Sequence, residues 1–290
     1  MPKERFIEAH PDPSIACRRV KIVRVGSEKR STEQDVVAEE SPLEIRIEGK
    51  PIAVIMRTPG HDEELAAGFL LSEGVIARRE DIFELSTCPS QADGGTAINI
   101  LLARPDAVDF GKLTRHVFSA SSCGICGKAA TDAVLQNFPA LKADKVRVSP
   151  QIIFSLSDKL RAAQATFAST GGLHASGLFD LEGNLLWLRE DVGRHNAVDK
   201  VLGAAFLENR LPLASHILML SGRVSFELMQ KALAARIPLV AAIGAPSSLA
   251  VSFAESSGQT VCGFVREGRM NIYAYPERIA DTSRAKSRPG

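Results

Sequence analysis

The sequence predicts an α/β protein in which a smaller β-rich α+β domain precedes a larger layered α/β domain. In the second half of the chain, apolar segments of strand length alternate with segments of helix length, which is typical of α/β layers. In the first half, alternating apolar and polar residues separated by turn residues indicate hairpins. A length of 290 residues also favours about two domains.

The first half begins with little periodicity up to about Thr32, and we expect this part to form a flexible arm. Alternating residues then flank the turn-like Glu48-Gly49-Lys50-Pro51, and acidic residues open a segment that Gly74 terminates. The elements expected here are a hairpin of strands 43–47 and 52–56, a helix over 62–72 and a strand over 96–103.

The second half has a more regular alternation of the two element types. The turn Leu181-Glu182-Gly183-Asn184 separates two strand-like segments and predicts a hairpin. The expected helices are 157–167, 196–207, 225–235 and 248–255, and the expected strands are 174–179, 185–188, 216–220, 239–243, 260–265 and 271–275.

These elements divide the chain into five parts. They are an N-terminal arm (1–32), a smaller β-rich domain (33–118), a cysteine-containing loop with the helix after it (119–150), an α/β domain (151–278) and a C-terminal tail (279–290).

Composition excludes several classes of partner. The chain has 35 basic and 34 acidic residues, a formal net charge of +1, so no global field indicates nucleic acid or an anionic membrane. Basic runs such as Arg18-Arg19-Val20-Lys21 are expected to be solvated. No stretch approaches the roughly 18 consecutive apolar residues of a spanning helix, and the first residues lack an apolar signal region. We therefore expect a cytoplasmic protein without a membrane partner.

The motif with the most chemistry is a cysteine pair in a glycine-flanked loop, Ser121-Ser122-Cys123-Gly124-Ile125-Cys126-Gly127-Lys128. An Ala-rich helix is expected over 128–138, directly after it. The N–H groups at the start of that helix and the Lys128 ammonium would lower the pKa of nearby thiols. Cys123 and Cys126 could therefore form a redox disulfide, supply half of a zinc site, or carry sulfur.

Spacing and context rank these three alternatives. A structural zinc site commonly needs a second closely spaced pair, and the other three cysteines, Cys17, Cys88 and Cys262, stand alone. The pair has thioredoxin-like spacing, but it lies in the middle of the chain and not after a first strand. A sulfur carrier remains, in which one thiolate holds a terminal sulfur as a persulfide and the glycines let the loop move. No metal site is expected.

Three turns at the starts of helices have the composition of phosphate-binding sites. Arg194 and His195 lie in the first, and Ser221, Gly222 and Arg223 form the second. The third is Gly244-Ala245-Pro246-Ser247. Ligands of open α/β sheets gather at the carboxyl ends of the strands, so three such turns in one domain indicate an anionic ligand. Neither GxGxxG nor GxxxxGK[ST] is present, so an ordinary dinucleotide or ATP site is unsupported.

Asp191, His195 and Asp199 recur at a spacing of four residues, which places them on one face of a helix. A carboxylate beside His195 could orient the imidazole for proton transfer. The alternative is a capping aspartate with a surface ion pair, and spacing alone does not separate the two. His174 at the start of a strand is expected to be structural.

Several long motifs together resemble the FdhD/NarQ family of formate dehydrogenase accessory proteins. They are SSCGICG, TGGLHASGLFD, EDVGRHNAVDKVLG, LSGRVSFELMQKALAARIPLV, GAPSSLAV and GFVREGRMNIY, in this order. The resemblance extends from about Leu43 to Tyr275. It implies a cytidine-deaminase-like α/β domain with an added smaller domain, and a homodimer.

The resemblance also implies a function. Members of this family are cytoplasmic sulfur carriers, sulfurtransferases that accept persulfide sulfur from a cysteine desulfurase. They pass it to molybdenum bis(molybdopterin guanine dinucleotide), the cofactor of formate dehydrogenase. A non-catalytic chaperone that only binds and delivers this cofactor is the alternative. Because the cofactor has two pyrophosphate arms, more than one phosphate-binding turn fits it, and guanine nucleotides are expected to mimic it.

Residue roles follow from the same resemblance. Cys123 matches the family's persulfide-bearing cysteine and Cys126 its partner. The segment Phe264-Val265-Arg266-Glu267-Gly268-Arg269 matches the one assigned to cofactor binding. Deaminase activity is not expected, because zinc deaminases need H-x-E and P-C-x-x-C elements. Here Ser122, not proline, precedes the cysteine pair, and His174 is not followed by glutamate at that spacing.

Overall fold

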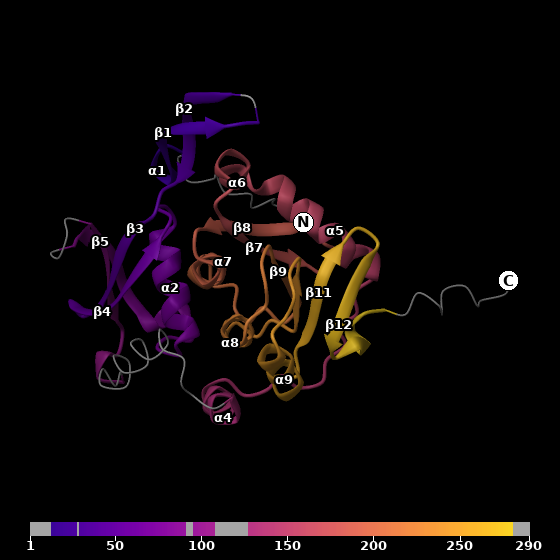
Figure 1. Cartoon of the computed structure of the whole chain (residues 1–290). Helices are drawn as coiled ribbons and strands as arrows, with labels where there is room; N and C mark the ends of the chain where they lie inside the picture. The colour runs from indigo at the N-terminus through magenta and orange to yellow at the C-terminus, as the bar shows by residue number, and fades with distance from the viewer. Residues whose placement is uncertain (1–12, 28, 91–94, 108–126, 281–290) are drawn as a thin grey trace, which may run out of the picture.

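Three sheets organise the part of the chain that the computed structural model describes, residues 13–27, 29–90, 95–107 and 127–280 (Figure 1). A six-stranded sheet has the order β12-β11-β10-β9-β7-β8, a four-stranded sheet has the order β4-β3-β6-β5, and β1 pairs with β2. The predicted α/β class with a smaller β-rich part is confirmed. The strands are β1 Cys17–Val25, β2 Arg30–Ala38, β3 Ser41–Ile47, β4 Lys50–Arg57, β5 Ile82–Pro89, β6 Thr96–Leu102, β7 His174–Asp180, β8 Leu185–Asp191, β9 His216–Leu220, β10 Leu239–Ala242, β11 Thr260–Arg266 and β12 Arg269–Ala274.

Helices connect and cover these sheets. Parallel strands need crossover connections, and α8 and α9 supply them between β9, β10 and β11, which are parallel. The helices are α1 Pro13–Ala16, α2 Asp62–Ser72, α4 Gly127–Asn137, α5 Pro150–Ala163, α6 Ala165–Thr170, α7 Arg194–Leu207, α8 Phe226–Ala234 and α9 Ser248–Ser257, with short 3-10 turns at Arg79–Asp81, Pro105–Ala107 and Pro276–Arg278. Among the described helices, none is long and apolar enough to cross a membrane.

The helix expected over 157–167 is wrong in its bounds. The structure has α5, which begins at Pro150, and a separate short helix, α6. Ser149 caps α5, since its side chain accepts a hydrogen bond from the Gln151 N–H, and proline at the first helical position needs no N–H partner. This start signal lies earlier in the sequence than the apolar residues from which the helix was predicted.

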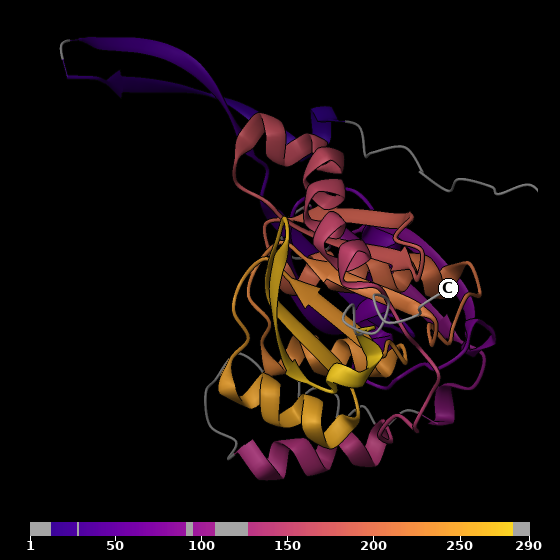
Figure 2. The same cartoon turned by 90° about the vertical axis from the view of Figure 1, so that its right-hand side faces the viewer.

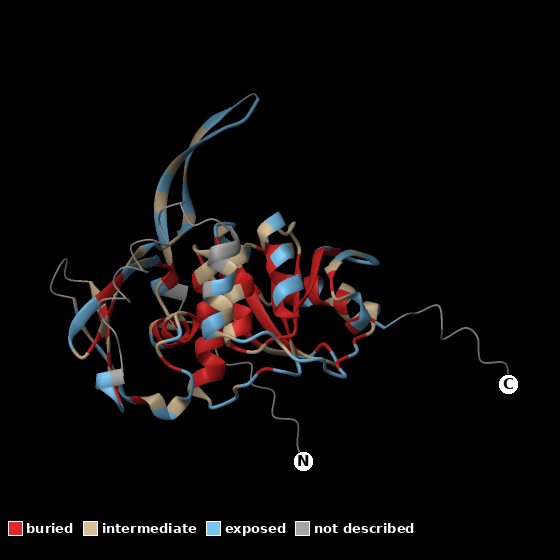
Figure 3. Cartoon of the chain, turned by 90° about the horizontal axis from the view of Figure 1, so that it is seen from below, coloured by how far each residue is buried: buried red, intermediate tan, exposed pale blue. Residues whose placement is uncertain are grey.

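Apolar side chains fill both faces of the six-stranded sheet. On one face α5 contributes Ile153, Leu156 and Leu160 to a core with Phe179 and Met219. The other face is covered by α7, α8 and α9, and their core continues without a break into the smaller domain. Figure 3 shows this buried interior running through the middle of the molecule, while the β1–β2 hairpin is largely exposed.

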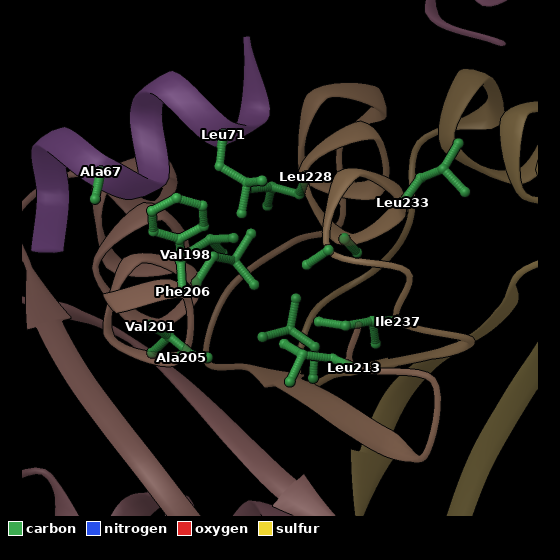
Figure 4. Packing of buried hydrophobic residues seen from close by; sticks show 14 of the residues in the cluster. Ala67, Leu71, Val198, Val201, Ala205, Phe206, Leu213, Leu228, Leu233 and Ile237 are labelled. Carbon is green, nitrogen blue, oxygen red and sulfur yellow. The ribbon is translucent and has the colours of Figure 1, made fainter. Parts of the chain in front are cut away.

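The two domains meet where α2 packs on α7 (Figure 4). Ala67 and Leu71 of α2 lie beside Val198 and Phe206 in a shared apolar cluster. The helices cross so closely that a Cβ added at Gly68 would lie 1.8 Å from the carbonyl oxygen of Asp199. A Cβ at Gly203 would likewise lie 1.8 Å from the carbonyl oxygen of Glu64. One glycine on each helix therefore sets the distance between the domains.

The expectation of a flexible arm up to Thr32 is wrong for the described residues from Pro13 onward. Cys17–Val25 and Arg30–Ala38 form an antiparallel ribbon that projects from the body of the protein (Figure 2). Most of its side chains are exposed or half-buried on both faces. Because the ribbon has no strongly buried face, the sequence carries no clear apolar alternation there. Strand β5 also lacks a buried stripe, and the sequence did not predict it.

Candidate functional site

The three turns predicted to bind phosphate meet at one edge of the six-stranded sheet. Strands β8, β9, β10 and β11 all point the same way, because β8 and β9 are each antiparallel to β7. The turns that follow β8, β9 and β10 therefore emerge together. Backbone hydrogen bonds connect the last two: Gly244 N–H donates to the Gly222 carbonyl at 3.0 Å, and Val224 N–H to the Ala245 carbonyl at 3.1 Å. Tertiary structure thus brings together turns that lie between about 20 and 50 residues apart in the sequence.

The turn after β8 is held by the buried carboxylate of Asp191. Its Oδ1 accepts hydrogen bonds from the Gly193 N–H at 2.8 Å and the Asn196 amide at 2.9 Å. Its Oδ2 lies 2.8 Å from the Lys200 Nζ and accepts from the Thr58 N–H at 3.1 Å. Asp191 therefore fixes the backbone from which α7 starts and ties it to the smaller domain.

Arg194 begins α7, where helix N–H groups and the guanidinium both favour an anion. The side chain is half-buried, and its Nε is fully buried without a hydrogen-bond partner among the described residues. A buried donor left unpaired costs about 1–3 kcal/mol, so it is normally satisfied by a bound group. An anionic oxygen at this position would satisfy it.

His195 faces the turn after β9. Its Nε2 lies 3.4 Å from the Ser225 Oγ and 3.9 Å from a Glu227 carboxylate oxygen. The interaction with His195 is the main cause that lowers the pKa of the Glu227 carboxyl, to about 2, against the opposing effect of partial burial. Glu227 therefore stays ionised beside the imidazole. His195 thereby links the first and second turns.

His174 starts β7 at the same edge and was expected to be structural. A Cβ added at Gly222 would lie 3.2 Å from the His174 Nδ1, so the absence of a side chain at Gly222 makes room for the imidazole. Burial lowers the pKa of His174, and the charges of Arg194 and His195 lower it further. The neutral form of His174 is therefore favoured beside the Arg194 guanidinium.

The residues of the second turn have different roles. Ser221 anchors the turn to β7, because its Oγ accepts from the Ala175 N–H at 2.8 Å and its own N–H donates to the Ala175 carbonyl at 3.0 Å. Gly222 carries the close contacts with His174 and Gly244. Arg223 is exposed and extends the positive charge outward.

The segment 264–269 lies where β11 ends and turns into β12. Phe264 is 42% exposed, has a φ of 54°, and donates its N–H to the Gly244 carbonyl at 3.1 Å, so it adjoins the third turn. Val265 points into the core on the α5 side of the sheet. The other four residues form the exposed end of the hairpin, with Gly268 at a φ of 70°: Arg266, Glu267, Gly268 and Arg269.

The suggested pairing of Asp191 or Asp199 with His195 is not what the structure shows. Asp191 pairs with Lys200, and Asp199 pairs with the Lys231 Nζ at 2.8 Å. All four side chains are buried, so the surface ion pair of the alternative is not seen either. Burial raises the pKa of Asp199, which the Lys231 ammonium opposes. These carboxylates stabilise the domain junction, while the neighbours of His195 are Ser225 and Glu227.

Cys123 and Cys126 lie outside the described residues. The helix that follows them, α4, is anchored on the larger domain: the Leu141 N–H just after it donates to the Ser257 carbonyl at the end of α9, at 2.8 Å. The two helices lie side by side and run in the same direction (Figure 2). The first residues of α4, which follow Cys126 in the chain, therefore lie at the same end of this helix pair as the first residues of α9. The third turn directly precedes α9.

The described cysteines have other surroundings. Cys262 is fully buried in β11, and burial raises the pKa of its thiol to about 12. Cys17 and Cys88 are half-buried and form no disulfide. Among the described residues, no three His, Cys, Asp or Glu side chains lie close enough to hold a metal ion together.

Sequence reasoning missed three members of this edge. Thr58 comes from the smaller domain, and its Oγ1 accepts from the Val192 N–H at 3.2 Å. Ser225 and Glu227 follow the second turn by a few residues and contact His195. The sequence predicted a helix that starts at Ser225, and in the structure this residue is the N-cap. Only the fold reveals that a histidine from another turn faces it.

The edge defines the class of protein: an α/β protein in which three turns predicted to bind anions meet beside its domain junction. The chain belongs to the FdhD/NarQ family, whose model matches residues 38–280. It is 47% identical over 272 residues to the sulfur carrier protein FdhD of Streptomyces coelicolor, covering 90% of this chain and 95% of the relative. It is also 43% identical to that of Sulfurisphaera tokodaii, covering 90% and 98%.

A solved structure has the same fold. A protein from Desulfotalea psychrophila, assigned as a formate dehydrogenase accessory protein, superposes with a TM-score of 0.73 at 27% identity, covering 91% of this chain and all of the other.

Proposed function

We propose that this protein is a cytoplasmic sulfur carrier that serves formate dehydrogenase. It accepts sulfur from a cysteine desulfurase and transfers it to molybdenum bis(molybdopterin guanine dinucleotide), its bound substrate. Membership of the FdhD/NarQ family and the names of its relatives support this proposal. The observation that carries the cofactor side is the meeting of three anion-binding turns at one sheet edge, with the Arg194 Nε buried and unpaired.

The sulfur chemistry is assigned to Cys123 and Cys126. The Cys123 thiolate attacks the outer sulfur of the desulfurase persulfide, so a new S–S bond forms on Cys123 and the desulfurase thiol leaves. The Cys126 thiolate then attacks the inner sulfur of this persulfide. A Cys123–Cys126 disulfide forms, and the terminal sulfur leaves with the electron pair as hydrosulfide for the molybdenum centre. A dithiol reductant must reduce the disulfide before the next cycle.

Other described thiols suit this chemistry less well. A persulfide is accepted by a thiolate, and the pKa of Cys262, at about 12, keeps that buried thiol protonated at neutral pH. Cys17 starts the projecting ribbon and Cys88 lies on the smaller sheet, so neither belongs to the edge of the six-stranded sheet. The helix α4, in contrast, starts on the side of the third turn.

The cofactor side is explained by charge and by hydrogen-bond donors. Two pyrophosphate arms need cationic side chains and N–H groups, and Arg194, His195 and Arg223 lie on adjacent turns. The segment 264–269, which borders the third turn through Phe264, adds two more arginines. We also propose that the protein is a homodimer, because a dimer would hold two such sheet edges in one assembly.

The alternative is a chaperone that binds and delivers the cofactor without sulfur transfer. A double Cys123→Ala/Cys126→Ala variant separates the two in a deletion strain. A sulfur carrier loses formate dehydrogenase activity in this variant, whereas a chaperone retains it.

Two experiments on the purified protein test the proposal directly. After incubation with a cysteine desulfurase and cysteine, intact mass should show added sulfur on the wild type and its loss in Cys123→Ala; added sulfur on the double variant would contradict the assignment. GDP should raise the melting temperature of the wild type but not of Arg194→Ala. Arg104→Ala, an exposed arginine of the smaller domain, is the matched control and should respond like the wild type.

A further inference from the structure

The projecting β1–β2 ribbon has two faces of different character. Successive side chains of a strand point to opposite sides, and the register pairs Lys21 with Gln34 and Val23 with Thr32. One side, here called the basic face, consists of Arg19, Lys21, Val23, Val25, Arg30, Thr32, Gln34 and Val36. The other, here called the paired face, consists of Arg18, Val20, Ile22, Arg24, Ser31, Glu33, Asp35 and Val37.

Charge is balanced on the paired face and unbalanced on the basic face. On the paired face Arg24 lies 3.2 Å from Glu33, and Arg18 lies 2.7 Å from Glu39 beyond the end of β2. The basic face carries the cations Arg19, Lys21 and Arg30 and no carboxylate. Within the described chain, none of these three cations forms a salt bridge.

The basic face also exposes apolar side chains. Val23 is 50% exposed and Val25 is 71% exposed, although the body of the protein buries most of its large aliphatic residues. Moreover, β1 pairs with β2 alone among the described strands, so its outer edge presents the unpaired N–H and C=O groups of alternate residues along a nine-residue strand. A two-stranded ribbon is marginal in water, and a third strand stabilises it.

We propose that the outer edge of β1 binds an extended, acidic segment of a partner protein as a third strand. Main-chain hydrogen bonds to β1 would supply affinity, as in other cases of strand addition. Carboxylates at alternate positions of the segment would lie beside Arg19 and Lys21, and apolar side chains beside Val23 and Val25. This docking surface does not depend on the proposed sulfur transfer, and its loss would leave the sheet edge and the cysteine pair unchanged.

Valine side chains and an open strand edge distinguish this surface from a nucleic-acid site. Proteins bind single-stranded nucleic acid with aromatic platforms in addition to cations, and β1 and β2 contain no aromatic residue. An acidic peptide matches the cations, the valines and the backbone edge at once.

The test measures binding of a fluorescein-labelled synthetic peptide to the full-length protein by fluorescence anisotropy. Every second residue of this peptide would lie on the basic face, and these positions are two glutamates followed by two valines, with threonine between them. Arg19→Gln/Lys21→Gln removes two charges from the basic face, and Arg18→Gln/Arg24→Gln removes two from the paired face. Both lower the net charge equally. We expect the first double variant to weaken binding about tenfold and the second less than about threefold. Unchanged melting temperatures would confirm that both variants remain folded.

Two control ligands complete the experiment. A peptide with lysine in place of glutamate, and one with proline in place of valine, which lacks the N–H groups for strand pairing, should both bind at least about tenfold more weakly. Three results would overturn the proposal. They are an equal loss of peptide affinity in the two double variants, equal affinity for the control peptides, and tighter binding of a single-stranded oligonucleotide of the same charge. The proposal would also be overturned if the wild type did not bind the peptide and Arg19→Gln/Lys21→Gln changed the oligomeric state. That result would assign the ribbon to contacts between two copies of this protein.

Discussion

Substitution of Gly68 by alanine should strongly destabilise the protein, although alanine is the better helix former. In an isolated helix this change would stabilise by about 1 kcal/mol. In the structure the new Cβ would lie 1.8 Å from the carbonyl oxygen of Asp199, whereas ordinary contacts begin at 3.4 Å. The neighbouring atoms are backbone of α7, so the helices must separate by about 1.6 Å to relieve the clash.

The separation disrupts more than one contact. It would loosen the shared apolar cluster around Ala67, Val198 and Phe206. It would also stretch the hydrogen bond that the Ser72 hydroxyl of α2 donates to the Asp199 carboxylate of α7. Overpacking of a core alone costs about 1–3 kcal/mol. With the loosened cluster and the stretched buried hydrogen bond added, we expect the free energy of unfolding to fall by about 3 kcal/mol or more.

Urea unfolding followed by circular dichroism measures this effect. Gly172→Ala is the matched control, because its Cβ would meet the Ala38 Cβ at 3.6 Å without a clash. This control should stay within about 1 kcal/mol of the wild type. If Gly68→Ala were as stable as the control, the close crossing of α2 and α7 would be refuted.

Three further predictions concern buried ionisable groups. Lys231→Met leaves the Asp199 carboxylate unpaired and should cost about 3–5 kcal/mol at neutral pH. Because burial raises the pKa of Asp199, the deficit relative to the wild type should shrink as the pH falls and the carboxyl is protonated, in urea unfolding measured at several pH values. The pKa of His174 is lowered below 6.5, so the folded state binds fewer protons than the unfolded state. The wild type should therefore lose stability as the pH falls below about 6.5, and His174→Gln should lose less. Melting temperatures measured against pH would show this difference. Cys262 should resist labelling by a thiol reagent in the native Cys123→Ala/Cys126→Ala variant and react after denaturation, and rapid native labelling of that residue would contradict its burial.

Elements that bury a clear face were predictable from the sequence. Helix α2 and strand β9 have the predicted bounds, and β10, α9 and β11 differ from the predictions by two residues or fewer. Their apolar residues recur at the period that the element requires, because one side of each contacts the core. The β1–β2 ribbon and β5 were missed because they have no such side, and α5 was misplaced because its start depends on Ser149 and Pro150.

The residues of the candidate site were predicted in part. Arg194, His195, Ser221, Gly222 and Arg223 were chosen because glycine and cationic residues start helices after strands, and the structure places all of them at one edge. Spacing suggested the wrong neighbours for His195, since i, i+4 spacing counts only residues of the same helix.

By itself the sequence determined the strands and helices that bury a clear face, the cysteine pair and the three turns, because these follow from local chemistry and periodicity. Only the tertiary structure decided which turns meet, that Asp191 and Asp199 pair with lysines, and that two glycines set the distance between the domains. Those outcomes depend on contacts between residues far apart in the chain, and such contacts are fixed when strands take their order in the sheet and helices pack across it.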